Sequence, residues 1–277
     1  MDSMEKTNVR IIIAAHKRYR MPADSMYVPL QVGAGKRAEQ DDGIWGPEYV
    51  RDDTGENISD LNPSFCELTG LFWAWKNLDA DYIGLVHYRR HLSLKRKRDL
   101  WSSVLTYEQL MPYLGKVKVF VPVKRKYYIE TLYSHYQHTH YASQLDEMRN
   151  VIDVKYPDHV SSYDRVVKHR YGYMFNMMVM EKECYNEYCS WLFDILFEMR
   201  KSLGEQEELS AYQRRFYGRL AEIALNIWLD KKIGFGELHR EEVMELPCIH
   251  MEKINWWKKG TAFCKAKFFG VKYEGSF

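Results

Sequence analysis

Residues 81–91 read DYIGLVHYRRH and carry more information about the fold than any other stretch. A short apolar run ends there in an imidazole, a phenol and two guanidinium groups, those of His87, Tyr88, Arg89 and Arg90. If the apolar run is a buried strand, these side chains lie at its C-terminal end, the edge at which open α/β sheets bind ligands. Adjacent arginines suit a diphosphate, because guanidinium groups stay charged and bind oxygens in pairs. The alternative is a strand that leads into a solvated basic loop.

The residues before this segment predict the elements that flank it. Residues 9–15 are apolar and mostly β-branched, which predicts a buried first strand. Residues 20–60 are rich in Pro, Gly and Asp and are expected to be mostly loop. A helix is predicted to begin at Asn62-Pro63 and to present one apolar face up to Trp75. The order strand, loop, helix, strand favours a parallel βαβ unit.

The rest of the chain continues the alternation of strands and helices. Strands are predicted at 117–123 and 173–180, and helices at 127–153, 185–199 and 216–229. We therefore expect an α/β domain over residues 1–250, with a mostly parallel central sheet flanked by helices, and a basic and aromatic C-terminal extension over 251–277.

Composition limits the class of protein. The chain has 277 residues, of which 46% are hydrophobic, so it can bury a substantial core. A net charge of +2 does not favour nucleic acid as a partner. Five cysteines without a Cys-x-x-Cys pair suit a reducing compartment, and we see neither a signal peptide nor a run of about 18 apolar residues. A cytoplasmic location is expected.

Several longer segments resemble a family of small bacterial glycosyltransferases of capsule, exopolysaccharide and O-antigen synthesis, long known only as a domain of unknown function. The most specific blocks are NPSFCELTGLFWAWKN (62–77) and YIGLVHYRR (82–90). Further matching segments are IIAAHK (12–17), DTGENIS (53–59), SHYQHTH (134–140), NMMVMEKECYNEYCSWLF (176–193), residues 222–229 and residues 253–277. One departure is Ile223, where this family is expected to carry a basic residue.

The resemblance implies a GT-A-like fold and transfer of a sugar, preferably galactose, from a UDP-sugar to a growing glycan. Galactofuranose and glucose stay open as donor sugars, and the acceptor is expected to be lipid-linked. The end of the first strand, Ala15-His16-Lys17, is placed where such folds hold the nucleoside. Asp53 and Asn57 belong to the same nucleotide-sugar site by resemblance.

The diphosphate end is unusual for this fold. Most GT-A enzymes hold a divalent metal with an Asp-x-Asp motif, whereas the equivalent strand here ends in His87-Tyr88-Arg89. We hypothesise that Arg89 and Arg90, aided by His87, stabilise the departing UDP directly, so that loss of Arg89 costs about 3 kcal/mol. Arg90 could instead pair with a structural acid. No metal site is assigned, although Mn²⁺ or Mg²⁺ stays open as a cofactor.

The acceptor and the catalytic base are expected further along the chain. His135, His138 and His140 are possible metal ligands, but 138 and 140 would point to different faces of a helix. We predict instead that His138 and His140 contact the acceptor, with contact to the donor or a plain polar surface as the alternatives. Asn176 could bind acceptor hydroxyls or form a turn. Glu222, an acid in an apolar helix, is the predicted catalytic base, with a buried salt bridge to Arg219 as the alternative.

Other functions remain as competing interpretations. An RNA-binding module would use the basic stretch from Arg89 to Arg98. A histidine-metal hydrolase lacks convincing ligand spacing. The lysines and aromatic residues after residue 252 favour peripheral contact with an anionic membrane surface, or docking of this tail onto the protein itself.

Overall fold

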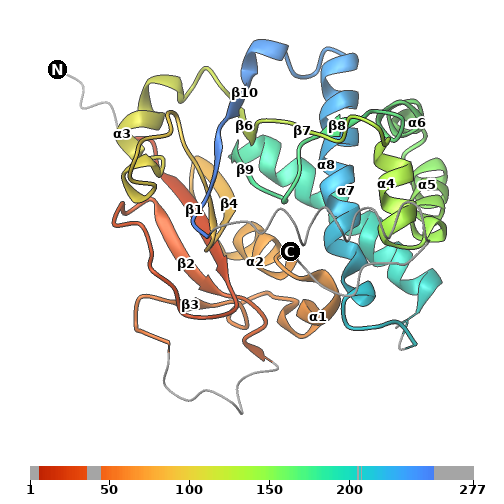
Figure 1. Ribbon diagram of the computed structural model, residues 1–277, viewed down its shortest axis with the longest axis horizontal. Coiled ribbons are helices and arrows are strands. Elements are labelled where there is room, and N and C mark those ends of the chain that lie inside the picture. The colour runs from red at the N-terminus through yellow and green to blue at the C-terminus, as the bar shows by residue number, and fades with distance from the viewer. Residues whose placement is uncertain (1–5, 36–44, 205, 207, 253–277) are drawn as a thin grey trace.

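A nine-stranded sheet runs through the computed structural model, which describes residues 6–35, 45–204, 206 and 208–252 (Figure 1). Along its main path the strands are ordered β10-β6-β9-β4-β1-β2-β3, and β5 joins β4 to β11. The strands are β1 (Val9–Ala15), β2 (Tyr27–Gln31), β3 (Val50–Arg51), β4 (Tyr82–His87), β5 (Arg90–Leu92), β6 (Val119–Pro122), β9 (Met178–Glu181), β10 (Val243–Leu246) and β11 (Cys248–His250). A separate ribbon pairs β7 (Arg125–Lys126) with β8 (Tyr171–Gly172).

The strand pairing brings the ends of several strands together at one edge of the sheet. β1 lies between β2 and β4 and is parallel to both, which confirms the predicted βαβ unit. β3 continues parallel to β2, and β10 is parallel to β6. β9 runs antiparallel between β4 and β6. The carboxyl ends of β1, β2, β4 and β6 therefore meet the beginning of β9 at one edge.

Helices cover the sheet, and two hydrophobic cores fill its two faces. The helices are α1 (Asn62–Phe65), α2 (Leu68–Asn77), α3 (Tyr107–Leu110), α4 (Leu132–Thr139), α5 (Ala142–Lys155), α6 (Val160–Val166), α7 (Lys182–Leu203) and α8 (Phe216–Gly234). Ile12 and Ala14 of β1 pack with α2, α7 and α8, whereas Ile11, Ile13 and Ala15 pack with the α3 side. Burial on both faces explains why β1 is apolar at nearly every position.

The described part of residues 20–60 is mostly loop, as predicted, although the short strands β2 and β3 form within it and extend the parallel sheet. One prediction about the first half of the chain needs correction, because the helix expected from residue 62 to 75 is not continuous. Cys66 has a φ of 54° and interrupts it, so that α1 ends at Phe65 and α2 begins at Leu68.

The second half differs in similar ways. The helix expected over 127–153 begins only at residue 132 and is divided into α4 and α5. The strand expected over 173–180 is confined to β9, because Phe175 and Asn176 have positive φ values of 77° and 52°. No helix in the described part of the chain is long and apolar enough to cross a membrane. The predicted tail contact falls on residues 253–277, outside the described residues.

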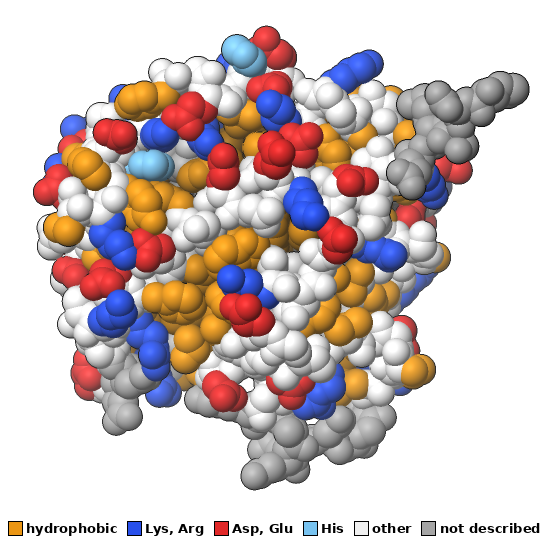
Figure 2. All heavy atoms as spheres, turned by 180° about the vertical axis from the view of Figure 1, so that it is seen from behind, with side chains coloured by type: hydrophobic (Ala, Val, Ile, Leu, Met, Phe, Trp, Pro, Cys, Tyr) orange, Lys and Arg blue, Asp and Glu red, His pale blue; other side chains and the backbone are white. Residues whose placement is uncertain are grey.

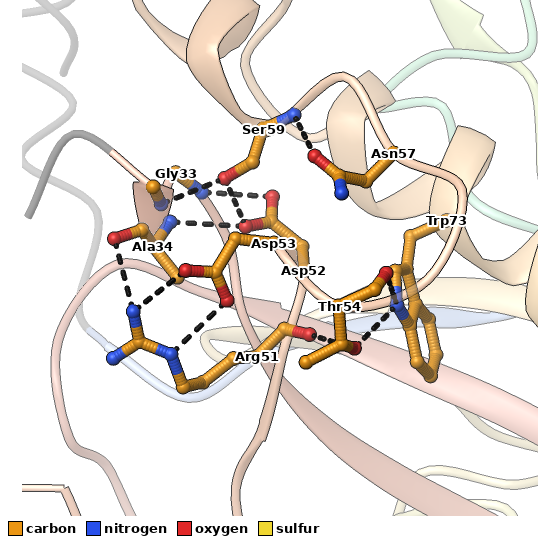
Figure 3. A network of polar contacts seen from close by, with 10 residues as sticks. Gly33, Ala34, Arg51, Asp52, Asp53, Thr54, Asn57, Ser59 and Trp73 are labelled. Carbon is orange, nitrogen blue, oxygen red and sulfur yellow. Dashed lines mark hydrogen bonds and ion pairs between the residues drawn. The ribbon is translucent and has the colours of Figure 1, made fainter. Parts of the chain in front are cut away.

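A buried carboxylate fixes the loops that follow β2 and β3 (Figure 3). Asp52 is 0% exposed and accepts hydrogen bonds from the backbone N–H groups of Gly33 (2.8 Å) and Ala34 (2.9 Å). It also accepts from the hydroxyls of Ser59 (2.5 Å) and Thr69 (2.7 Å). One side chain thus joins β3, the loop after β2, and α2.

We expect Asp52→Ala to lower the free energy of unfolding by about 3 kcal/mol or more, because hydrogen bonds to a charged group are lost and buried donors stay unsatisfied. Urea unfolding measures this loss. The matched control is Asp53→Ala, which removes a partly exposed ion pair with Arg51 (2.7 Å) and should cost about 1 kcal/mol or less. Equal losses in the two variants would contradict this account of the loops.

Candidate active site

The ends of β1 and β4 form the first part of the site. His16 follows β1 and Tyr88 follows β4, and their side chains meet because these parallel strands are neighbours. The Tyr88 hydroxyl lies 3.1 Å from Nε2 of His16, and the two rings are 5.0 Å apart in an edge-on arrangement. Lys17 Nζ lies 5.6 Å from the centre of the Tyr88 ring. An aromatic ring, an imidazole and a cation thus share one corner of the edge.

Arg89 lies near Lys17 at the same corner of the sheet edge. It lies in the tight connection between β4 and β5, and its guanidinium makes a 2.9 Å ion pair with Glu252. The same carboxylate lies 3.8 Å from Lys17. Arg89 and Lys17 therefore already share one anionic group, which is the arrangement that a phosphate would need.

Arg90 turns toward the centre of the edge. Its guanidinium lies 4.7 Å over the ring of Phe175, at the entry to β9. Its Nε is buried and has no hydrogen-bond partner among the described residues. A buried cationic donor without a partner is unusual and points to a ligand or water at this place.

A strained pair of residues lies beside Arg90. Nε2 of His87 is 2.6 Å from the carbonyl oxygen of Phe175. Asn176 is 1% exposed, and its Nδ2 donates to Oε1 of Glu67 (2.8 Å) and to the carbonyl of Gly218 (2.9 Å). Left-handed backbone at two successive non-glycine residues is costly and is held here by these contacts. The positive φ of Asn176 agrees with a turn, one of its two predicted roles. Contact with acceptor hydroxyls stays a prediction.

Glu67 joins this cluster, although the sequence interpretation did not include it. Burial by itself would raise its pKa, but His87, the Asn176 hydrogen bond, its own backbone N–H and Arg219 together leave the pKa below its usual value. Cys66, just before it, accepts a hydrogen bond from Nε of Arg215 at 3.1 Å. The sequence signal for Glu67 was weak, a single acid in an amphipathic helical segment.

Glu222 enters the site from α8. Its carboxylate makes a 3.0 Å ion pair with Arg219, so the salt bridge considered as an alternative does form. Burial raises the pKa of Glu222, and the nearby charge of Glu67 adds to this, while Arg219, Arg125 and Arg90 oppose it. Two carboxylates in one cluster thus have pKa values displaced in opposite directions, a pattern typical of sites that use them differently.

The histidines of α4 are organised by an acid that sequence reasoning also missed. Glu130 is 2% exposed and lies 2.8 Å from Nδ1 of His135 and 2.6 Å from Nδ1 of His138. Asp146 of α5 accepts a hydrogen bond from the hydroxyl of Tyr133. Because a carboxylate holds both Nδ1 atoms, the rings are oriented with Nε2 pointing away from Glu130.

His140 and the two remaining predicted nucleotide residues make contacts mainly within their own segments. His140 is 2% exposed and stacks on Tyr136, so His138 is the more accessible of the two predicted acceptor residues. Asp53 and Asn57 lie in the loop fixed by Asp52 (Figure 3). Asp53 pairs with Arg51, and Asn57 accepts from the backbone of Ser59 (3.2 Å). In the described ranges no three His, Cys, Asp or Glu side chains converge as metal ligands.

Comparison with known proteins shows the family to which the chain belongs. A model described as a domain of unknown function, DUF4422, matches residues 10–233. The chain belongs to this DUF4422 family. No curated protein sequence matches it at a significant level.

Among solved structures, this DUF4422 chain is similar to the apo structure of the WbbM bifunctional glycosyltransferase. The TM-score is 0.78 and the sequence identity 28%, over 89% of this chain and 46% of that chain. The chain thus spans about half the length of that protein. Together with the mostly parallel sheet flanked by helices, this likeness confirms the predicted GT-A-like α/β fold.

Proposed function

We propose that this DUF4422 protein is a glycosyltransferase that moves a sugar from a UDP-sugar to a glycan acceptor. The observation that carries the proposal is the grouping of His87, Arg89 and Arg90 at the carboxyl end of β4, beside an ion-paired glutamate, in a fold similar to half of a glycosyltransferase. Binding at this edge follows the general rule for open α/β sheets.

The donor occupies the edge from β1 to β5 in this proposal. Ala15, His16 and Lys17, with Tyr88, hold the nucleoside, and Asp53 and Asn57 complete the nucleotide side from the neighbouring loop. His87, Arg89 and Arg90 bind the diphosphate and stabilise the negative charge that develops on the leaving UDP. The guanidinium groups supply the charge that a metal bound by Asp-x-Asp supplies in other GT-A enzymes.

Glu222 is the proposed catalytic base, in a transfer that inverts the anomeric centre. The acceptor oxygen forms a bond to the anomeric carbon while the bond from that carbon to the phosphate oxygen breaks. The hydroxyl proton passes to the Glu222 carboxylate, and the bonding electron pair leaves with UDP. His138, His140 and Asn176 are proposed to position the acceptor from α4 and the entry to β9.

The finer substrate assignment follows the family resemblance. We propose galactose as the donor sugar and a lipid-linked glycan acceptor, in capsule, exopolysaccharide or O-antigen synthesis. A lipid-linked acceptor requires the protein to approach a membrane surface, for which the basic and aromatic residues 253–277 are suited by composition.

The RNA-binding alternative receives no support from the fold. The basic stretch does not form one surface, because Arg90 is partly buried and His91 is 0% exposed, whereas residues 95–98 lie in an exposed loop. Figure 2 shows acidic and basic side chains intermingled on the rear face of the molecule. A mixed surface does not attract a polyanion strongly.

The donor class is tested by thermal unfolding in the presence of UDP, GDP, CMP or ADP. We expect UDP to raise the melting temperature selectively, because a ligand at about a hundred times its Kd stabilises the native state by about 2.7 kcal/mol. An equal response to all four nucleotides would show binding without base recognition. No response to any of them would contradict the proposed function.

A further inference from the structure

We propose that Glu67 binds hydroxyl groups of the donor sugar and so helps to select which sugar is transferred, an inference that rests on the proposed glycosyl transfer. Nothing in the sequence pattern assigns this role. It follows from how the backbone, the hydrogen bonds and the surrounding charges hold this one carboxylate.

The backbone first brings Glu67 into the cluster. The helical segment after Asn62 is interrupted at Cys66, whose φ of 54° and ψ of −129° lie outside the helical region. Glu67 is consequently the residue immediately before α2 and is only partly buried, whereas the next three residues of α2 are buried. Backbone strain of this kind persists where surrounding contacts enforce it and is concentrated at functional sites.

Hydrogen bonds then fix the direction of the carboxylate. Nδ2 of Asn176 donates to Oε1 of Glu67 at 2.8 Å and, at 2.9 Å, to the carbonyl of Gly218 in α8. A carboxylate offers about four lone-pair positions. The Asn176 amide and the backbone N–H of Glu67 itself use only part of this capacity. The remaining positions can accept hydrogen bonds from hydroxyl groups.

Glu67 is linked by contacts to the residues that are proposed to bind the diphosphate. Phe175 contacts the Arg90 guanidinium through its ring, and the next residue, Asn176, holds Glu67. His87 binds the carbonyl of Phe175 from the end of β4. Because residues adjacent in the chain contact Arg90 and Glu67, we expect a sugar bonded to a diphosphate at Arg90 to lie near the Glu67 carboxylate.

The charges around Glu67 distinguish its role from that of a catalytic base. His87 and Arg219 favour its ionised form, whereas burial favours the neutral form of Glu222. A carboxylate that stays ionised is a weak base but a strong hydrogen-bond acceptor. A site that hydrogen-bonds a sugar hydroxyl also rejects analogues that lack it, because its own polar group is then left unpaired.

The test compares nucleotide with nucleotide-sugar. Titrations of UDP, UDP-galactose, UDP-galactofuranose and UDP-glucose are made on the full chain, as wild type and as Glu67→Gln. The glutamine keeps the oxygen that accepts from Asn176 but removes the charge. We expect the affinity for UDP to change by less than about twofold and the affinity for the preferred UDP-sugar to fall by about tenfold or more. Glu198→Gln, at a surface pair with Lys201, is the matched control and should change neither.

Each other result overturns the inference in an identifiable way. Unchanged affinity for the UDP-sugar shows that Glu67 does not bind the sugar. An equal loss for UDP and UDP-sugar shows that it supports the nucleotide end or the fold. If wild-type protein binds neither UDP nor any UDP-sugar, the proposed function itself fails, and this inference fails with it.

Discussion

Replacing Arg90 with alanine is expected to lower kcat/KM for the UDP-sugar by about a hundredfold to a thousandfold. The guanidinium is partly buried over Phe175, and its Nε has no partner in the described part of the chain. Such a donor is held in place before the reaction and needs no rearrangement when charge develops on the leaving diphosphate. Steady-state kinetics with UDP release as the readout measure the effect.

The control for Arg90 is Arg149→Ala, which removes a 2.8 Å ion pair with Asp164 on helices away from the sheet edge. It should leave kcat/KM unchanged. Arg90→Lys keeps the charge but loses the paired donor geometry, so its rate should fall between wild type and alanine. Near-normal turnover of both Arg90→Ala and Arg89→Ala would refute stabilisation of UDP by arginine.

Replacing Glu222 with glutamine is expected to lower kcat by about a hundredfold or more, because the amide cannot accept the acceptor proton. The pH dependence gives a sharper test. Only the ionised carboxylate is a base, so kcat rises with pH through the pKa of Glu222. Burial raises this pKa, with a smaller contribution from Glu67, against the opposing charges of Arg219, Arg125 and Arg90. The acid limb of the profile therefore lies at higher pH than for an ordinary glutamate.

Glu222→Gln should remove this acid limb together with most of the rate, while UDP affinity stays close to that of wild type. Circular dichroism checks that the fold survives loss of the ion pair with Arg219. The matched control is Glu237→Gln, which alters an ion pair between Glu237, just after α8, and Lys232 in the last turn of α8. This variant should keep the acid limb of the pH profile. A variant at 222 with a normal rate and an unchanged limb would leave Glu222 as a structural partner of Arg219 only.

The central βαβ unit could be predicted from sequence because its signals are local. β1 and β4 are apolar runs with abrupt polar ends, and Asn62-Pro63 marks the start of a helix. Parallel pairing then places His16 beside Tyr88 without further information. The placement of the His16–Tyr88 corner beside the arginines thus follows from periodicity and one topological rule.

Elements whose formation depends on tertiary contacts were missed. β2 contains Pro29, which lacks a backbone N–H and makes the segment resemble a loop, yet it pairs with β1 from one side. Cys66 and Phe175 have positive φ values but are not glycines, so nothing in their type indicates a turn. Asn176 is of a type that favours turns, but its type alone does not fix its conformation. Their conformations are held by His87, Arg215 and Glu67, which come from distant parts of the chain.

The acidic residues of the site show the same limit of prediction from sequence. Glu222 was recognisable because residues 220, 221 and 223–225, which flank it in α8, are apolar. Glu67 and Glu130 were not, because single acids in amphipathic or polar segments usually lie at the surface. Only the fold shows that Glu130 lies between two histidines and that Glu67 receives the Asn176 amide.

The central claim is that arginine side chains at the carboxyl end of β4 bind the diphosphate of a UDP-sugar without a required metal. Calorimetric titration of UDP in the presence of EDTA, into wild type and into the Arg89→Ala/Arg90→Ala double variant, tests it most directly. We predict that UDP binding to wild type survives EDTA and that the affinity of the double variant for UDP is about a hundredfold lower. Binding that appears only with Mn²⁺, or equal affinity in the two proteins, would contradict it.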